Sequence, residues 1–229
     1  MSTETDNKAK LRHELSYWCG RKRAEGKLKN IHFEALMLAM AKENSQDFLK
    51  GKVVVDFGCG PRGSLEWATE ARLRIGVDVL ADDYIRTCGS KEHNMVYVCS
   101  TESSIPLPSN YADVLFTMNA FDHVANTAVM ARELMRILAP GGQFIASFNL
   151  YEPKTVHEPN TLTSGQLHGL FGDYLESWEP RTVPKGPGND SYRYFFCGSD
   201  KVPKDRQGKP HVMWLRGTKR QAGDFEHRF

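Results

Sequence analysis

Polar side chains follow the apolar runs of this chain at the points where strands would end. These residues are Asp56, Asp78, Ser100, Asn119 and Asn149. After the fourth run, the segment Asn119–His123 brings an amide, a carboxylate and an imidazole into five residues. Such groups can orient a polar ligand, and a carboxylate or an imidazole can also move a proton. Because ligands of open α/β sheets bind beyond the carboxyl ends of the strands, we expect a small-molecule site there.

A glycine-rich turn stands where backbone groups would approach a nucleotide. The run Val53–Phe57 is apolar and β-branched, as in a strand that is covered on both faces. Three glycines follow it in a G-x-G-x-x-G spacing: Gly58, Gly60 and Gly63. We expect a helix over Ser64–Arg72 and a second strand over Arg74–Asp78. Asp78 then lies about 20 residues beyond the first strand, where an acidic side chain binds ribose hydroxyls.

The topology of strand, glycine turn and helix serves NAD, FAD and S-adenosylmethionine, so residues near the turn must decide among them. Asp56 stands two residues before Gly58. A carboxylate there would repel a pyrophosphate but would suit the ammonium group of a methionine moiety. The sequence therefore favours S-adenosylmethionine as the cofactor over a nicotinamide cofactor and an oxidoreductase activity.

The signatures V-D-F-G-C-G, from Val55 to Gly60, and L-x-P-G-G, from Leu138 to Gly142, stand in order with the apolar runs. Between about Gly51 and Asn149 the chain resembles class I S-adenosylmethionine-dependent methyltransferases of the small-molecule, type 11-like group. The resemblance implies a Rossmann-like α/β fold. Its seven-stranded, mostly parallel sheet would have helices on both faces and an N-terminal helical cap.

The resemblance also implies cofactor contacts. Gly58 and Gly60 would line the methionine end, and Asp78 would bind the ribose hydroxyls. Val79 would flank the adenine. The family often has an Asp after the third strand, where this chain has Ser100, so Ser100 and backbone groups would supply the adenine contact. The full expected set is Asp56, Gly58, Gly60, Asp78, Val79, Ser100, Thr101 and Asn119.

Four residues are candidates for aligning or deprotonating a substrate: Asn119, His123, Tyr151 and Tyr17. Asn119 and His123 follow the fourth strand, beside the reactive end of the cofactor. The aromatic rings of Tyr17 and Tyr151 could hold a sulfonium by cation–π attraction, worth about 0.5–2 kcal/mol each. In the resembling family the histidine at the position of His123 usually orients its turn, so a structural role is expected as an alternative to the catalytic one.

An extended pattern sharpens the resemblance. The run Gly58–Trp67, with Tyr17-Trp18 upstream and His157-Glu-Pro159 downstream, is similar to azetidine-2-carboxylate synthases. In these enzymes the α-amine of S-adenosylmethionine displaces methylthioadenosine and closes a four-membered ring. Methyl transfer to a small-molecule acceptor is our first prediction and this cyclisation is the alternative. An inactive S-adenosylmethionine-binding module is the second alternative.

Length and composition fit a single domain over residues 1–229, with 40% apolar and 25% charged residues. We expect disorder over 1–9, a helical cap over 10–45 and the cofactor-binding core over 51–149. A lid loop would span 150–180, with a short helix from Thr163 to Tyr174. Closing hairpin strands would span 191–216, over Tyr192–Cys197 and His211–Arg216, and a further strand would lie before them around Trp178. A tail would begin at Gly217.

A net charge of +2 is too small to imply a nucleic-acid partner, and the basic residues between Arg21 and Lys29 suit a solvated helix face. No apolar run approaches the ~20 residues of a membrane helix, and the polar start lacks the apolar core of a signal peptide. We therefore expect a cytoplasmic protein without a membrane partner. Five cysteines without a C-x-x-C pair indicate neither disulfides nor a metal site. The oligomeric state stays open.

Overall fold

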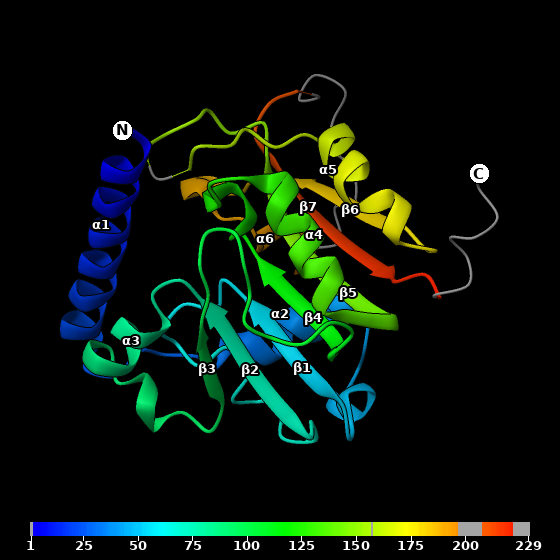
Figure 1. Cartoon of the computed structure of the whole chain (residues 1–229), viewed down its shortest axis with the longest axis horizontal. Helices are drawn as coiled ribbons and strands as arrows, with labels where there is room; N and C mark the ends of the chain where they lie inside the picture. Colours follow the sequence, from blue (N-terminus) through cyan, green and yellow to red (C-terminus); the bar gives the residue numbers. More distant parts are fainter. Residues whose placement is uncertain (1, 157, 197–207, 222–229) are drawn as a thin grey trace.

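The computed structural model describes residues 2–156, 158–196 and 208–221 (Figure 1). Its seven-stranded sheet has the order β3-β2-β1-β4-β5-β7-β6. The strands are β1 (Val53–Phe57), β2 (Leu73–Asp78), β3 (Val96–Cys99), β4 (Ala112–Met118), β5 (Leu138–Leu150), β6 (Glu179–Pro184) and β7 (His211–Thr218). β1 to β5 pair in parallel, and β7 runs antiparallel to both β5 and β6. The predicted Rossmann-like, mostly parallel sheet is confirmed.

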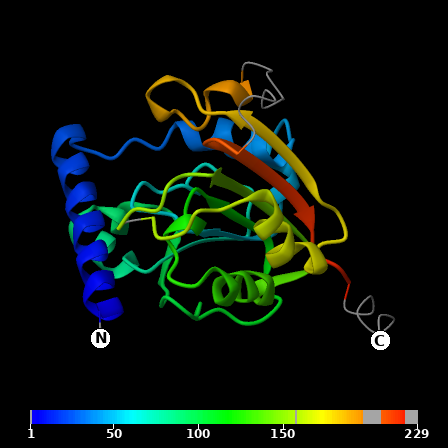
Figure 2. The same cartoon turned by 90° about the horizontal axis from the view of Figure 1, so that it is seen from above.

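Helices cover both faces of this sheet (Figure 2). The α-helices are α1 (Ser2–Glu25), α2 (His32–Ala41), α3 (Ala81–Thr87), α4 (Thr127–Ile137), α5 (Ser164–Phe171) and α6 (Arg193–Phe196). The short 3-10 helices are η1 (Gln46–Leu49), η2 (Ser90–Glu92), η3 (Phe121–His123), η4 (Gly172–Tyr174) and η5 (Pro187–Asn189). In Figure 1, α1 lies on the side to which the arrowheads of β1 and β2 point. It is therefore placed to cover the carboxyl ends of these strands.

The central strand shows why the sheet is buried on both faces. Val53 and Val55 pack into a core with α4 and α5, whereas Val54 packs into a second core with α2. All five residues of β1 are buried. Successive side chains of a strand point to opposite faces, so a continuous apolar run suits a strand between two layers of helices. β1 is thereby held rigidly, and so is the turn that follows it.

The structure differs from the sequence-based expectations in two places near the sheet. Residues 64–72 form turns instead of the predicted helix, with i to i−3 bonds such as Glu66 N to Gly63 O at 3.1 Å. The side chain of Ser64 is engaged by Asp56, which fixes the start of this segment. The strand predicted over 192–197 is wrong as far as Phe196, because α6 occupies its described part. Asp190 starts this helix by accepting bonds from the backbone N–H groups of Tyr192 and Arg193 at 2.9 and 3.2 Å.

The chain ends also differ from expectation. α1 begins at Ser2, so residues 2–9 are helical where disorder was predicted. Periodicity could not reveal this segment, since a helix extends one bond at a time from a packed part without needing an apolar stripe of its own. At the other end β7 continues to Thr218, and residues 222–229 lie outside the described residues, as does Cys197. The strand expected near Trp178 is found as β6, and the short helix expected after Thr163 is found as α5.

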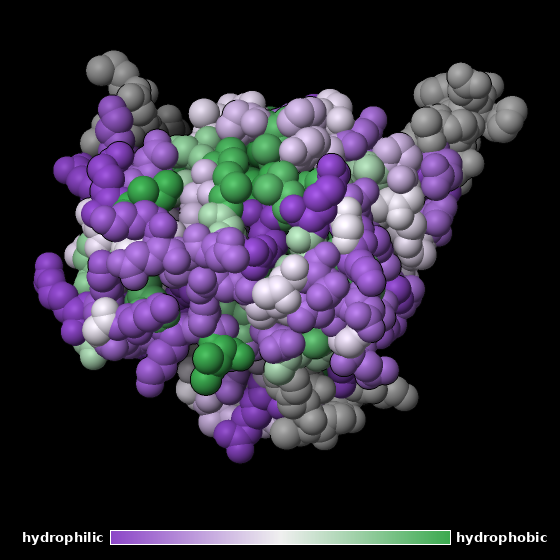
Figure 3. Space-filling model, turned by 90° about the horizontal axis from the view of Figure 1, so that it is seen from below, coloured by the Kyte–Doolittle hydropathy of each residue, from purple (hydrophilic) through white to green (hydrophobic). Residues whose placement is uncertain are grey.

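The face of the molecule in Figure 3 is mostly hydrophilic, with one larger apolar area among polar residues. In the part of the chain that the structure describes, no helix combines the length and the apolar character needed to cross a membrane.

Candidate functional site

A cavity of about 600 Å³ opens at the carboxyl ends of β1, β2 and β4, with α1 and α2 forming part of its wall. It brings together most of the site residues predicted from the sequence: Tyr17, Asp56, Gly58, Gly60, Asp78, Val79, Asn119 and His123. Several lining residues were not predicted for the site: Lys10, His32, Phe33, Leu36, Glu102 and Tyr192. The site is thus built where an open α/β sheet binds its ligands.

The glycine turn shapes one wall of this cavity. Gly58 has a φ of +71°, and a Cβ atom added there would lie 2.1 Å from the Cβ atom of Ala120. Gly60 has a φ of +57°, with the ring of Trp18 at 3.5 Å from the position of its missing Cβ. Both glycines therefore adopt a backbone conformation that L-residues avoid. At Gly58 there is also no room for any side chain beside the turn after β4.

Asp78 ends β2 with its carboxylate turned back to the glycine turn. Its Oδ2 accepts a hydrogen bond from the backbone N–H of Gly60 at 3.1 Å, and its Oδ1 accepts one from Leu80 at 2.9 Å. Burial, followed by the nearby carboxylate of Glu14, raises the pKa of Asp78 to about 7. A carboxylate oxygen can accept more than one bond, so this side chain is oriented and still able to bind hydroxyl groups.

Asp56 is almost completely buried at the end of β1 and lines the same cavity. Its Oδ2 accepts a bond from the hydroxyl of Ser64, whereas its Oδ1 has no hydrogen-bond partner among the described residues. Burial raises the pKa of Asp56 to about 7, with a further contribution from Asp78 and an opposing one from Ser64. A cationic ligand group at this oxygen would remove the cost of burying an unpaired carboxylate. The ammonium group of S-adenosylmethionine fits that requirement.

α1 is fastened over the glycine turn by a group of side chains around Arg62. The Arg62 guanidinium donates two bonds to Glu25, at 2.8 and 2.9 Å, and lies 5.3 Å from the centre of the Trp18 ring. This pairing lowers the pKa of Glu25 to about 2. Arg62 lies within the extended motif Gly58–Trp67, whose spacing predicts no role for it. In the structure it joins the turn after β1 to the helix that covers the cavity.

Asn119 follows β4 and forms a polar network at the inner end of the cavity. Its Nδ2 donates to the hydroxyl of Tyr192 at 2.8 Å, and its Oδ1 accepts from Ser147 at 3.1 Å. Its own φ is +48°, a left-handed conformation that asparagine tolerates better than most residues. Burial raises the pKa of Tyr192 to about 12, so its hydroxyl remains protonated at neutral pH. Tyr192 was missed because its segment was predicted to be a strand.

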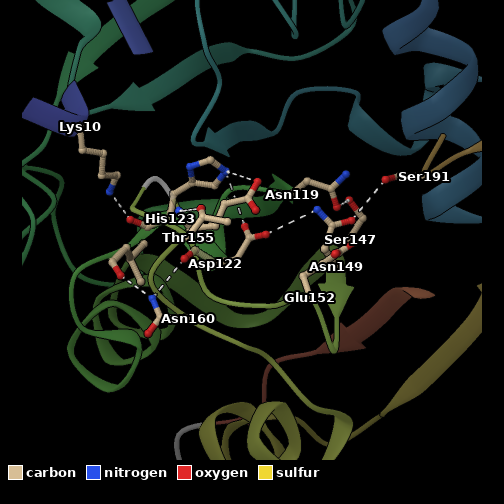
Figure 4. Close-up of polar contacts among 12 residues, drawn as sticks. Lys10, Asn119, Asp122, His123, Ser147, Asn149, Glu152, Thr155, Asn160 and Ser191 are labelled. Atoms are coloured by element: carbon tan, nitrogen blue, oxygen red, sulfur yellow. Dashed lines mark hydrogen bonds and ion pairs between the residues drawn. The ribbon is translucent and has the colours of Figure 1, made fainter. Parts of the chain in front are cut away.

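His123 lies on the wall of the cavity between two carboxylates. Its Nε2 is 3.9 Å from Oδ1 of Asp122 and 3.8 Å from Oε1 of Glu158. Figure 4 shows His123 and Asp122 side by side, with Asn149 on the other side of Asp122. Burial raises the pKa of Asp122 above its usual range. His157, from the extended sequence pattern, lies outside the described residues.

Three predicted site residues do not line this cavity. Ser100 is buried and its hydroxyl has no partner among the described residues. Thr101 donates a bond to the carbonyl of Ser104 at 3.3 Å. Tyr151 packs against the ring of His211, with 5.2 Å between the ring centres. Each of these residues follows its strand as expected, but the Thr101 side chain bonds within its own turn and the Tyr151 ring is used in packing.

Comparisons with known proteins agree with this geometry. Residues 55–146 match a family model described as a methyltransferase domain. An uncharacterized methyltransferase of Mycobacteroides abscessus is 26% identical over 177 residues, which cover 74% of this chain and 63% of that protein. This chain therefore spans less than two thirds of the curated relative it matches.

Solved structures share the fold at low identity. One is the putative methyltransferase in a complex with the Haloferax volcanii Trm112 methyltransferase activator. It has a TM-score of 0.64 at 17% identity, and the match covers 90% of this chain and 98% of that chain. Phosphoethanolamine N-methyltransferase 2 of Haemonchus contortus has a TM-score of 0.55 at 17% identity, over 75% of this chain and 49% of that chain.

The domain match confirms the cofactor that Asp56 and the glycine turn predict, S-adenosylmethionine. These comparisons do not show the subgroup of azetidine-2-carboxylate synthases. Over residues 55–146 the chain is similar to the methyltransferase domain family, and this part of the chain carries the Rossmann-like strand order and the cavity beside the glycine turn.

Proposed function

We propose that this protein transfers the methyl group of S-adenosylmethionine to a small-molecule acceptor. The buried Asp56 carboxylate carries this proposal, because its Oδ1 faces no partner among the described residues and suits the cofactor ammonium. The bound cofactor would supply a methyl group on a sulfonium: an acceptor lone pair would form a bond to the methyl carbon while the carbon–sulfur bond breaks, and S-adenosylhomocysteine would leave with an uncharged sulfur. The chain itself has to align the two reactants and exclude water from between them.

The described side chains suit this positioning task. Asn119 is held by Ser147 and Tyr192, so its amide and the Tyr192 hydroxyl form a fixed polar edge near the end of β4. Phe33 and Leu36 of α2 add apolar surface to the lining of the cavity. Trp18, held by Arg62, lies over the glycine turn. A small polar acceptor with an apolar part matches these surroundings, which supports a small molecule over a nucleic acid.

Cyclisation of the cofactor is the second candidate. In that reaction the α-amine lone pair forms a bond to the γ-carbon, the carbon–sulfur bond breaks, and methylthioadenosine leaves. The amine must first give up a proton. Asp56 supports this candidate, since its raised pKa of about 7 makes it a better proton acceptor than an ordinary carboxylate. An inactive cofactor-binding module is the third reading, and the missing adenine contact at Ser100 supports it.

The test is to incubate the protein with S-adenosylmethionine, alone and with pools of small amines, alcohols and thiols, and to identify the products by mass spectrometry. Methyl transfer predicts S-adenosylhomocysteine and an acceptor heavier by one methylene, and only when the acceptor is present. Methylthioadenosine with a four-carbon cyclic amino acid, formed from the cofactor alone, would identify the cyclase instead. Tight binding without either product in all pools would support the inactive module.

A further inference from the structure

Asp122, His123 and Glu158 form a cluster that the cofactor does not use. One ligand atom from each of these residues lies within 4.8 Å of those of the other two. Asp122 and His123 come from η3, and Glu158 comes from the segment after β5, which folds back over the cavity. Glu158 belongs to the extended pattern His157-Glu-Pro159, but its meeting with Asp122 and His123 could not be predicted, because it stands 35 positions after His123.

The distances within the cluster are those of two long ion pairs and not of hydrogen bonds. His123 Nε2 stands 3.9 Å from Asp122 and 3.8 Å from Glu158, beyond hydrogen-bond length for both. Ligands around a tetrahedral ion at about 2.1 Å are about 3.4 Å apart, and the two distances from His123 exceed this spacing by about half an ångström. The three ligand atoms all lie within 4.8 Å of one another, so small side-chain movements would let them share a central ion.

A second observation points to a missing ligand. Asp122 is only 2% exposed, and its Oδ1, the atom on the side of His123, has no hydrogen-bond partner among the described residues. A buried carboxylate oxygen without a partner costs free energy. With a neutral imidazole, the two carboxylates carry a charge of −2, which a divalent cation would balance. Lys10 does not play this part, because its ammonium donates to the backbone carbonyl of His123 (Figure 4).

Surrounding residues hold the cluster in the way that outer-shell groups hold metal ligands. Asn149 donates to Oδ2 of Asp122 at 3.4 Å, and Ser191 donates to Asn149 at 3.2 Å. Asn160 donates to the carbonyls of Asp122 and Val124, at 3.1 and 2.6 Å, which fixes the turn (Figure 4). His123 and Glu158 also line the cavity, so open coordination positions would face the substrate side.

We propose that Asp122, His123 and Glu158 bind one divalent transition-metal ion, such as Zn²⁺ or Mn²⁺, at the wall of the cavity. One nitrogen and two carboxylate ligands favour such ions over Ca²⁺ or Mg²⁺, which prefer oxygen ligands alone. An ion with open positions there could hold an oxygen-bearing acceptor next to the methyl donor. That role rests on the proposed function, whereas the metal site itself does not.

The test uses Co²⁺, whose visible absorption reports its coordination, with the full-length protein after treatment with a chelator. We expect a d–d absorption band that saturates at one Co²⁺ per chain and disappears when Zn²⁺ is added. Glu158→Gln, at a partly exposed side chain, should abolish the band or weaken Co²⁺ affinity by more than 100-fold. Asn149→Ala should weaken it by about 10–100-fold through the outer shell. Glu176→Gln, at an exposed carboxylate on another segment, should leave it unchanged.

Affinity for S-adenosylhomocysteine and the melting temperature, measured on every variant, separate loss of the metal site from loss of the fold. No band at millimolar Co²⁺ in the wild-type protein would overturn the proposal. A band that survives both Glu158→Gln and His123→Ala in folded protein would also overturn it, because the ion would then bind elsewhere. Product analysis is not needed for either outcome, so the metal site can fail while the proposed function stands.

Discussion

A Cβ atom added at Gly58 would lie 2.1 Å from the Cβ atom of Ala120, so the turns after β1 and β4 touch at this point. Both turns line the cavity, and Ala120 is the neighbour of Asn119. The turns of two neighbouring parallel strands thus lie at one site. Gly58 is required both by the nearby turn after β4 and by its own φ of +71°.

Gly58→Ala should therefore weaken binding of S-adenosylhomocysteine by at least about tenfold, because the turn must shift to relieve the overlap. The left-handed backbone adds about 1–2 kcal/mol of strain for an L-residue. Calorimetric titration and denaturant unfolding measure the two effects. Gly165→Ala is the matched control, since nothing lies within 4 Å of its Cβ position in α5 and its φ is ordinary. Equal affinity of the Gly58 variant and the wild type would contradict the account of the turn.

The raised pKa values of Asp56 and Asp78 make the cofactor-free fold sensitive to pH. Both pKa values are about 7 in the folded state against a usual 3.8, so the folded state holds these protons more tightly than the unfolded chain does. Their contribution to stability is present in full below about pH 4 and is lost as the pH rises through 7. Denaturant unfolding at pH 5 and pH 8 should show lower stability at pH 8.

Asp56→Asn should remove roughly half of that pH dependence, since Asp78 retains its own share. The affinity for S-adenosylhomocysteine should increase with pH, whereas the stability of the cofactor-free fold decreases, because the ammonium group of the ligand favours the ionised form of Asp56. Affinity for the wild type should therefore rise between pH 5 and pH 8. The exposed Asp82→Asn serves as the control, and a pH dependence that Asp56→Asn leaves intact would show that the titrating group lies elsewhere.

Arg62→Ala should loosen α1 from the glycine turn. The variant loses the pairing with Glu25 and the contact with the Trp18 ring at 5.3 Å. We expect a two- to thirtyfold loss of S-adenosylhomocysteine affinity, which corresponds to about 0.5–2 kcal/mol for a cation–π contact. Amide hydrogen exchange in α1 should also become faster. Arg86→Ala, which removes an exposed pair with Asp83 in α3, is the control, and similar behaviour of both variants would contradict a specific role for Arg62.

Tyr192→Phe should separate positioning from cofactor binding. The change keeps the ring but removes the hydroxyl that accepts a bond from Asn119 at 2.8 Å. A buried amide N–H without an acceptor costs about 1–3 kcal/mol, so we expect turnover in the product assay to fall about 10- to 100-fold. Affinity for S-adenosylhomocysteine should stay within about threefold of the wild type. Tyr194→Phe tests the removal of a neighbouring hydroxyl in the same way, and comparable losses in both variants would argue against the Asn119 network.

The sequence was sufficient for the parts of the site that the backbone alone arranges. Asp56, Gly58 and Asp78 follow apolar runs, and parallel strands bring such positions to one edge, so they could be placed without a structure. Tyr192 could not, and neither could the meeting of Glu158 with Asp122 and His123, because both depend on tertiary contacts of segments that follow β5. The pattern at 64–72 predicted a helix, but the structure has turns there, because the Ser64 side chain bonds to Asp56 instead of starting a helix. Tyr151 follows its strand as predicted, but its ring packs against His211 and does not line the cavity.

The central claim is that the cavity beside the glycine turn binds S-adenosylmethionine through Asp78 and Asp56. Calorimetric titration of S-adenosylhomocysteine into the wild type and into Asp78→Ala tests it most directly. The account predicts saturable binding at one site per chain in the wild type. It predicts an affinity at least about tenfold lower in the variant, because charged hydrogen bonds to ribose are worth about 1.5–3 kcal/mol. No binding to the wild type, or equal binding to a folded Asp78→Ala, would contradict the assignment of this cavity as the cofactor site.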